Sequence, residues 1–132
     1  MKTNHKAVWL VVLIAQIIPA IWYGLFVDAY LSLNNLTMED TAHPIAYLVS
    51  IVSATALTYM LSYIYGRMNI VSAKDGAKTA LIIGFPIYIY ILGLMTWNLF
   101  SLRPYALAWL DGGVNLIILI IAGAIIGGWQ KK

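Results

Sequence analysis

Residues 7–27, AVWLVVLIAQIIPAIWYGLFV, form an apolar run of 21 residues with one strongly polar member, Gln16. As an α-helix this run rises about 31 Å, which matches the roughly 30 Å thickness of the hydrocarbon core of a bilayer. It therefore predicts one membrane span. Lys2 and Lys6 precede it as they would precede a signal peptide, but the run continues too far beyond Pro19 for cleavage there.

Three further apolar runs follow, at residues 44–65, 79–100 and 105–129. The second opens with Pro44, which suits a first helical turn, and Gly66 predicts its end. Of the 132 residues, 62% are hydrophobic and 10% are charged, against roughly 25% charged in a soluble domain. We therefore expect an all-α fold, a four-helix transmembrane bundle, as one integral membrane domain over residues 1–132.

The basic residues predict the orientation of the four spans. One side of the membrane receives Arg103, and the other receives Lys2, Lys6, Arg67, Lys74, Lys78, Lys131 and Lys132. Cytoplasmic loops collect Lys and Arg, so we expect both termini in the cytoplasm and a multi-pass protein of the cytoplasmic (inner) membrane. Tryptophans, which prefer the head-group level, agree, with Trp9 and Trp129 inside and Trp22, Trp97 and Trp109 outside.

The chemistry of the sequence favours neither an enzyme nor a nucleic-acid-binding protein. There is no cysteine, and no pattern of catalytic, phosphate-binding or metal-ligating residues is present, so we expect no catalytic residue, no metal and no cofactor. The net charge of +3 resides in clusters at the ends of the spans, where it meets lipid head groups. The expected partner is the lipid bilayer, with no nucleic acid.

Small residues at four-residue spacing predict where helices pack closely. Residues i and i+4 share a helix face, and small side chains there let two backbones approach each other. The residues concerned are Ser50, Ala54, Thr58 and Ser62 in the second span and the pair Gly123 and Gly127 in the fourth. We favour packing within one bundle over self-association as the use of these faces.

Polar residues inside the spans are the second signal, because an unpaired polar group in hydrocarbon is costly. For Gln16 we expect a hydrogen bond to Ser53 or Thr58. Tyr59, Tyr63 and Tyr65 are interpreted as an aromatic belt near the inner surface. In the outer loop, the spacing of Thr37 and Asp40 resembles a capping box and predicts a short helix near the membrane surface.

A candidate polar site lies at the outer ends of the spans, with Asp28, Asn98, Arg103, Asp111 and Asn115. If the fourth helix begins at Gly112, Asp111 is interfacial, and if it begins near Tyr105, Asp111 lies about 9 Å into the helix and needs a partner. Arg103 is the basic candidate. We favour a structural clasp of Arg103 and Asp111 over a pocket that binds a solute or a proton.

The order of motifs along the chain resembles the membrane family of domain of unknown function 1761. The resemblance is carried by Trp22, Tyr23, Phe26, Gly76, Leu99, Phe100, Arg103, Pro104, Asp111, Gly112, Gly123, Gly127 and Trp129. It implies a small four-helix membrane protein and brings no activity, substrate or cofactor. Its outer motif adds Trp22 and Tyr23 to Arg103 and Asp111 as candidate site residues.

Two functions remain as hypotheses. The first is a non-enzymatic helix-packing component that self-associates or joins a complex with another membrane protein. The alternative is a small transporter or channel with an outward-facing polar vestibule, built from the candidate residues at the outer ends of the spans.

Overall fold

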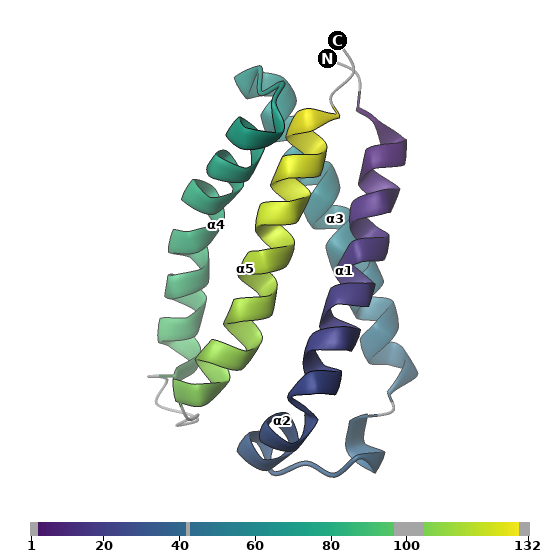
Figure 1. Ribbon diagram of the computed structural model, residues 1–132, viewed down its shortest axis with the longest axis vertical. Helices are drawn as coiled ribbons and strands as arrows, with labels where there is room; N and C mark the ends of the chain where they lie inside the picture. The colour runs from purple at the N-terminus through teal and green to yellow at the C-terminus, as the bar shows by residue number, and fades with distance from the viewer. Residues whose placement is uncertain (1–2, 42, 97–104, 130–132) are drawn as a thin grey trace.

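The computed structural model describes residues 3–41, 43–96 and 105–129, and every regular element among them is helical. In chain order these are α1 (His5–Leu25), α2 (Val27–Asn34), the 3-10 helix η1 (Glu39–Thr41), α3 (Pro44–Met68), α4 (Ala73–Thr96) and α5 (Tyr105–Gly128). The four long helices run side by side, while α2 and η1 lie across one end of them (Figure 1). The all-α prediction is confirmed.

Three of the described helices are long and apolar enough to cross a membrane. They are α1, α3 and the part of α5 from Trp109 to Gly128. The first turns of α4 carry Lys74, Asp75 and Lys78, and the end of the predicted third span, residues 97–100, lies outside the described residues. The bounds of α5 agree with the predicted fourth span, whereas α4 begins six residues before the predicted third span.

The first helix begins two residues before the predicted span because of Asn4. Its side-chain Oδ1 accepts a hydrogen bond from the backbone N–H of Ala7, which caps the helix start. The same side chain donates from Nδ2 to the carbonyl of Trp129 at 2.7 Å. Asn4 therefore joins the start of α1 to the end of α5, and both chain termini lie at this end (Figure 1).

The outer loop differs from its prediction. Thr37 and Asp40 do belong to a short helix and the turn before it, where the backbone N–H and the hydroxyl of Thr37 both donate to Asp40 Oδ2, at 2.8 and 2.7 Å. That helix, η1, is a single 3-10 turn. The longer helix of the loop is α2, which follows α1 directly after a break at Phe26 and which the sequence patterns did not predict.

The prediction that the second span ends at Gly66 is wrong. This span corresponds to α3. The helix continues to Met68, and Asn69 ends it with φ 53°, in the left-handed region. Asn tolerates this region better than other non-glycine residues, so it serves as the helix stop here. Gly66 lies within α3, because a glycine allows a helix to end but does not force it to end.

The most extensive interface of the described part is between α4 and α5, followed by those of α1 with α3 and with α5. Gly76 of α4 faces Gly123 and Gly127 of α5 so closely that an added methyl group would overlap with the Gly123 carbonyl oxygen. The glycine pair of α5 thus packs against α4 within the chain.

One residue of the predicted aromatic belt changes role once the helices are packed. Tyr65, interpreted from the sequence as part of an aromatic belt, is fully buried, and its hydroxyl donates to the carbonyl of Gly76 at 2.6 Å. Tyr63 is exposed beside the guanidinium of Arg67, as a belt residue should be. The core around Tyr65 also contains Val8, Leu61 and Ala122, and it lies toward the end that holds the termini.

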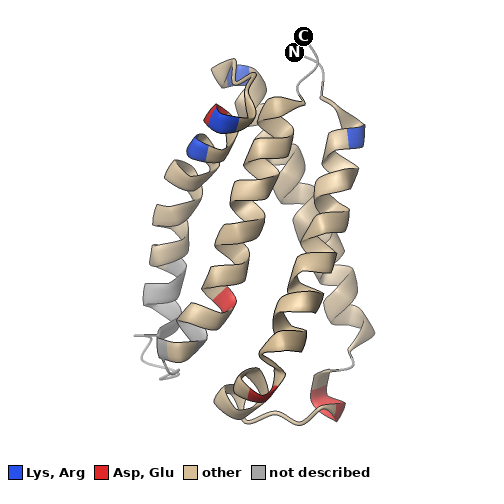
Figure 2. Cartoon of the chain, in the orientation of Figure 1, with Lys and Arg blue, Asp and Glu red and all other residues tan. Residues whose placement is uncertain are grey.

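Charge is separated along the long axis of the molecule. The described basic residues, Lys6, Arg67, Lys74 and Lys78, lie in the helix turns nearest the termini, while Asp28, Glu39, Asp40 and Asp111 lie toward the other end (Figure 2). Asp75 is the acidic exception among these residues, in the first turn of α4.

Candidate functional site

The centre of the candidate site is the carboxylate of Asp111. Because α5 begins at Tyr105, Asp111 lies six residues into the helix and is half-buried, which is the arrangement that requires a partner. The partner is the phenol of Tyr23 in α1, which donates to Asp111 Oδ1 at 2.6 Å. A hydrogen bond to a charged acceptor is among the stronger ones in proteins, so this contact joins α1 to α5.

The neighbouring residue Trp22 makes a second link between the same helices. Its indole N–H donates to the backbone carbonyl of Leu110 at 2.8 Å. The indole ring also lies close to Gly113, where an added methyl group would come within 3.2 Å of it. Trp22 and Tyr23 therefore hold one turn of α5 from adjacent positions of α1.

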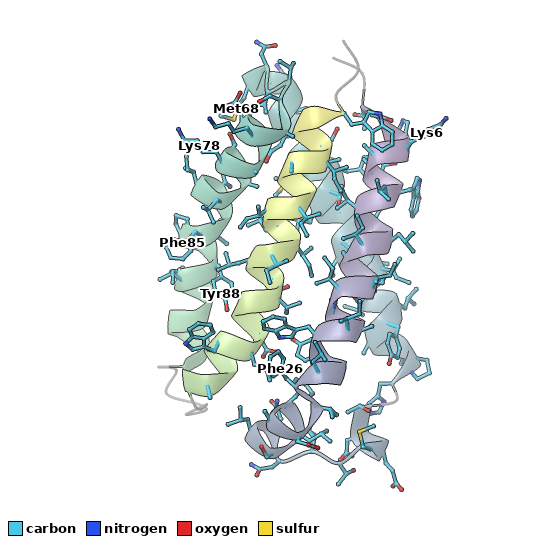
Figure 3. All side chains as sticks on the ribbon, in the orientation of Figure 1. Lys6, Phe26, Met68, Lys78, Phe85 and Tyr88 are labelled. Carbon is cyan, nitrogen blue, oxygen red and sulfur yellow. The ribbon has the colours of Figure 1, made fainter. Side chains whose placement is uncertain are left out.

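Aromatic side chains from two other helices complete the surroundings of Asp111. Tyr30 of α2 meets the ring of Tyr23 edge-on, with centroids 4.8 Å apart. Tyr88 reaches from α4 toward α5, as Figure 3 shows, and its phenol lies so close to Gly112 that a methyl group there would overlap with it. We call Trp22, Tyr23, Tyr30, Tyr88 and Asp111 the outer cluster.

A comparison with protein-family models matches residues 6–127 to the family described as protein of unknown function (DUF1761). The chain belongs to this family. The matched range contains the whole outer cluster and the close contact of Gly76 with Gly123. Comparisons with curated proteins and with solved structures gave no match.

The structure of this DUF1761 protein brings together part of the predicted site. Asn115 lies one turn after Asp111, and its Nδ2 donates to the Asp111 carbonyl at 2.6 Å. Asp28 is exposed in the first turn of α2. Asn98 and Arg103 lie outside the described residues, so the predicted clasp of Arg103 and Asp111 stays a prediction.

Sequence reasoning missed Tyr30 and Tyr88. Tyr30 lies in the helix that was not predicted, and Tyr88 is one of several aromatic residues in an apolar run, so neither stood out. Gly112 was a possible signal for Tyr88, because a glycine inside a helix often marks the close approach of another group. Nothing in the sequence said which group that was.

The predicted partner of Gln16 is corrected as well. Gln16 Oε1 accepts from the hydroxyl of Ser50 at 3.0 Å, while Thr58 donates to the carbonyl of Ala54 in its own helix. The prediction chose the right helix and the wrong residue. Gln16 Nε2 is buried and has no hydrogen-bond partner in the described part of the chain.

The second-span stripe of small residues is packed over half of its length. Thr58 and Ser62 are buried, Ala54 is half-buried and Ser50 is exposed. The predicted packing face therefore applies to the half of α3 nearer the termini. Toward the outer loop, the same face lines a cavity instead.

Asp40, in the 3-10 helix η1, is an acidic residue whose pKa is shifted by its neighbours. The backbone N–H of Thr37, its hydroxyl and the nearby His43 all favour the charged form of Asp40 and lower the pKa of its carboxyl. No three His, Asp or Glu side chains among the described residues are grouped as a metal site would require.

Proposed function

We propose that this DUF1761 protein crosses the cytoplasmic membrane four times, with both termini in the cytoplasm, and that it is a non-enzymatic helix-packing component. In this role it self-associates or joins a complex with another membrane protein. The membrane placement is supported by three sufficiently apolar helices and by the basic residues near one end of the molecule.

The observation that carries the association is the outer half of α3. No residue from Pro44 to Leu57 is buried, although the rest of this helix contributes Thr58, Leu61, Ser62 and Tyr65 to the interior. This half exposes Ile45, Leu48, Val49 and Val52. The glycine pair of α5 is already covered by α4, so we take the exposed half of α3 as the face for a second helix.

Cross-linking tests this proposal, and the absence of native cysteine makes single-cysteine variants unambiguous. Val52→Cys in α3 and Ile82→Cys in α4 are matched, since the two side chains are 59% and 61% exposed. In membranes of cells that express the protein, we expect a thiol-reactive cross-linker to join Val52→Cys to a second copy or to another protein, and not Ile82→Cys.

Native mass spectrometry of the gently extracted protein provides the second measurement. A dimer or a retained protein partner supports association. A strictly monomeric species, together with no cross-linked product from Val52→Cys, overturns the proposal.

A small transporter or channel is the second candidate, and the depth of Asp111 favours it. Ionisable residues inside membrane spans often mark the path of an ion or a solute, and here Asn115 lies one turn deeper on the same helix. Reconstituted vesicles should then show solute or proton flux that Asp111→Asn abolishes. Flux that this substitution leaves unchanged removes the candidate.

A further inference from the structure

The end of α4 nearest the termini carries two lysines on one face. Lys74 and Lys78 are four residues apart, so their side chains project from the same side of the helix. Both are exposed, and neither ammonium group forms an ion pair or a hydrogen bond with another described residue. The structure therefore presents two uncompensated positive charges in adjacent turns of this helix.

The acidic residue that lies between these lysines in the sequence, Asp75, is engaged in a cap. The hydroxyl of Ser72 donates to Asp75 Oδ2 at 2.6 Å, and the backbone N–H of Asp75 donates to Ser72 Oγ at 3.0 Å. Lys74 and Lys78 outnumber this carboxylate, so the first two turns of α4 keep a net positive charge. A surface of this sign attracts an anion.

An apolar groove of about 500 Å³ lies between α4 and α5. Its lining residues are Leu81, Ile82, Phe85 and Pro86 of α4 and Leu116 and Ile120 of α5. Ile82 and Phe85 are exposed, so the groove opens on the outside of the helix pair. None of these side chains has a hydrogen-bonding group, and a cavity of about 150 Å³ already admits benzene, so the groove has room for part of a hydrocarbon chain.

The lysines and the groove share one face of α4. Leu81, Ile82 and Phe85 lie three, four and seven residues after Lys78, and these positions fall on the same side of a helix. Figure 3 shows Lys78 and Phe85 projecting from the same side of α4. Phe85 lies about 10 Å along the helix from Lys78. The charged groups thus lie at the end of the groove that is nearest the termini.

This order of charged and apolar surface matches the depth profile of a bilayer. With α4 across the membrane and the termini in the cytoplasm, the lysines lie at the level of the lipid head groups and the groove faces hydrocarbon. The cytoplasmic leaflet contains anionic lipids, and basic pockets at the cytoplasmic ends of transmembrane helices bind their head groups. An apolar groove alone would accept the chain of any lipid, whereas the two lysines favour a lipid with an anionic head.

We propose that this face of α4, which we call the lysine groove, binds one anionic phospholipid. Lys74 and Lys78 contact the phosphate, and one acyl chain lies along Leu81, Ile82 and Phe85. The proposal rests on the membrane placement proposed above, which maleimide labelling from the two sides of the membrane tests separately. It is independent of association with another protein, since the face for that association is on α3.

Lipid titration of the gently extracted wild-type protein tests the proposal, with native mass spectrometry as the measurement. Dioleoylphosphatidylglycerol and dioleoylphosphatidylcholine have the same chains and differ in net charge, and glycerophosphate has the phosphate without a chain. We expect saturable binding of the phosphatidylglycerol, about tenfold tighter than that of the phosphatidylcholine, and no binding of glycerophosphate at the same concentrations. Equal affinities for the two lipids, or no saturable binding, overturn the proposal. Glycerophosphate that binds as tightly as the lipid also overturns it, because the site is then one for a soluble anion.

Removal of the lysine charges locates the head group. Lys74→Gln combined with Lys78→Gln changes two exposed side chains, so the variant should fold, and we expect it to lose the preference for phosphatidylglycerol. Lys6→Gln combined with Arg67→Gln is the matched control, because it removes two positive charges from the same end of the molecule, on α1 and α3. Figure 3 shows Lys6 on the side of the molecule away from Lys78. The control should keep the preference, and an equal loss in both variants overturns the site, since net charge alone would then explain the binding.

A substitution in the groove locates the acyl chain. Ile82→Asn places an amide against the chain, and Ile21→Asn in α1 is the matched control, since the two side chains are 61% and 59% exposed. We expect Ile82→Asn to weaken the binding of both lipids about three- to tenfold, because a hydrocarbon chain offers the amide no partner, and Ile21→Asn to leave it unchanged. The unfolding temperature without added lipid shows whether each variant is folded. Wild-type affinity for phosphatidylglycerol in both Ile82→Asn and the double lysine variant overturns the proposed site.

Discussion

At the scale of single residues, the contacts around the Asp111 carboxyl join α1 to α5. Asp111 lies six residues into α5 and receives the hydroxyl of Tyr23, while Trp22 donates to the adjacent carbonyl of Leu110. A phenol and an indole suit this half-buried site, because both combine an apolar ring with one polar atom. The two consecutive residues of α1 thus hold the outer end of α5.

Tyr23→Phe removes the hydrogen bond to Asp111 and keeps the ring. We expect a loss of stability of about 1–3 kcal/mol, because a half-buried acceptor loses its donor. Thermal unfolding in detergent measures this loss. Tyr47→Phe is the control, since Tyr47 is exposed toward the same end of α3. Equal unfolding temperatures of the two variants would contradict the role of Tyr23.

We expect the stability of the loop around η1 to depend on pH, because it contains Asp40. Thr37 lowers the pKa of Asp40, so the folded pKa lies below the unfolded value. The cap therefore stabilises the loop above the ordinary Asp pKa of about 3.9, and this contribution is lost as the pH falls through the lowered value. An NMR titration of the Asp40 carboxyl in the intact protein measures the shift.

Thr37→Val tests the cause of that shift. The variant retains the backbone N–H donor, which is the larger contribution, and removes the hydroxyl donor. We expect the pKa of Asp40 to return part of the way to its ordinary value. If the pKa of Asp40 in the wild-type protein has its ordinary value, the two hydrogen bonds from Thr37 to Asp40 are contradicted.

At the scale of elements, the helices differ in how completely they are packed. The close contact of α4 and α5 is possible because three glycines allow the two backbones to approach. In contrast, α3 is packed over the half nearer the termini and lines a cavity over the other half. A closely packed helix pair thus lies beside a helix of which one half has no buried residue, and the proposed association depends on that half.

Gly76→Ala tests the helix pair. The added methyl group would overlap with the Gly123 carbonyl oxygen and lie 2.9 Å from Gly127 Cα, both of them backbone atoms. We expect a loss of stability of about 1–3 kcal/mol or more, because backbone cannot move aside as a side chain does. Thermal unfolding in detergent is the measurement.

Gly24→Ala is the matched control for this substitution. Gly24 is also helical, and nothing lies within 4 Å of an added methyl group there. Alanine is intrinsically better than glycine in a helix by about 1 kcal/mol, so Gly24→Ala should be neutral or stabilising. If Gly76→Ala were as stable as Gly24→Ala, the described contact of α4 with α5 would be wrong.

At the scale of the whole molecule, the separation of charge provides the test of orientation. Met38 in the outer loop and Met68 at the end of α3 lie at opposite ends and are 64% and 55% exposed. In intact cells, we expect a membrane-impermeant maleimide to label Met38→Cys, and to label Met68→Cys after permeabilisation. The reverse pattern would invert the proposed topology.

The sequence by itself determined the all-α class, the positions of the apolar helices and the identity of most residues that later matter. These follow from local properties, since helix length, apolar content and the charge of flanking residues do not depend on what each helix contacts. The family match over residues 6–127 confirms the resemblance to DUF1761 that the order of motifs predicted.

Tertiary structure alone decided the pairing of these residues. Asp111 meets Tyr23, Gln16 meets Ser50, and Tyr65 enters the core instead of an aromatic belt. Each contact joins different helices, and its register depends on how the helices rotate and slide against each other. A short periodic pattern contains no information about that register, so the outer cluster, the exposed half of α3 and the lysine groove appear only in three dimensions.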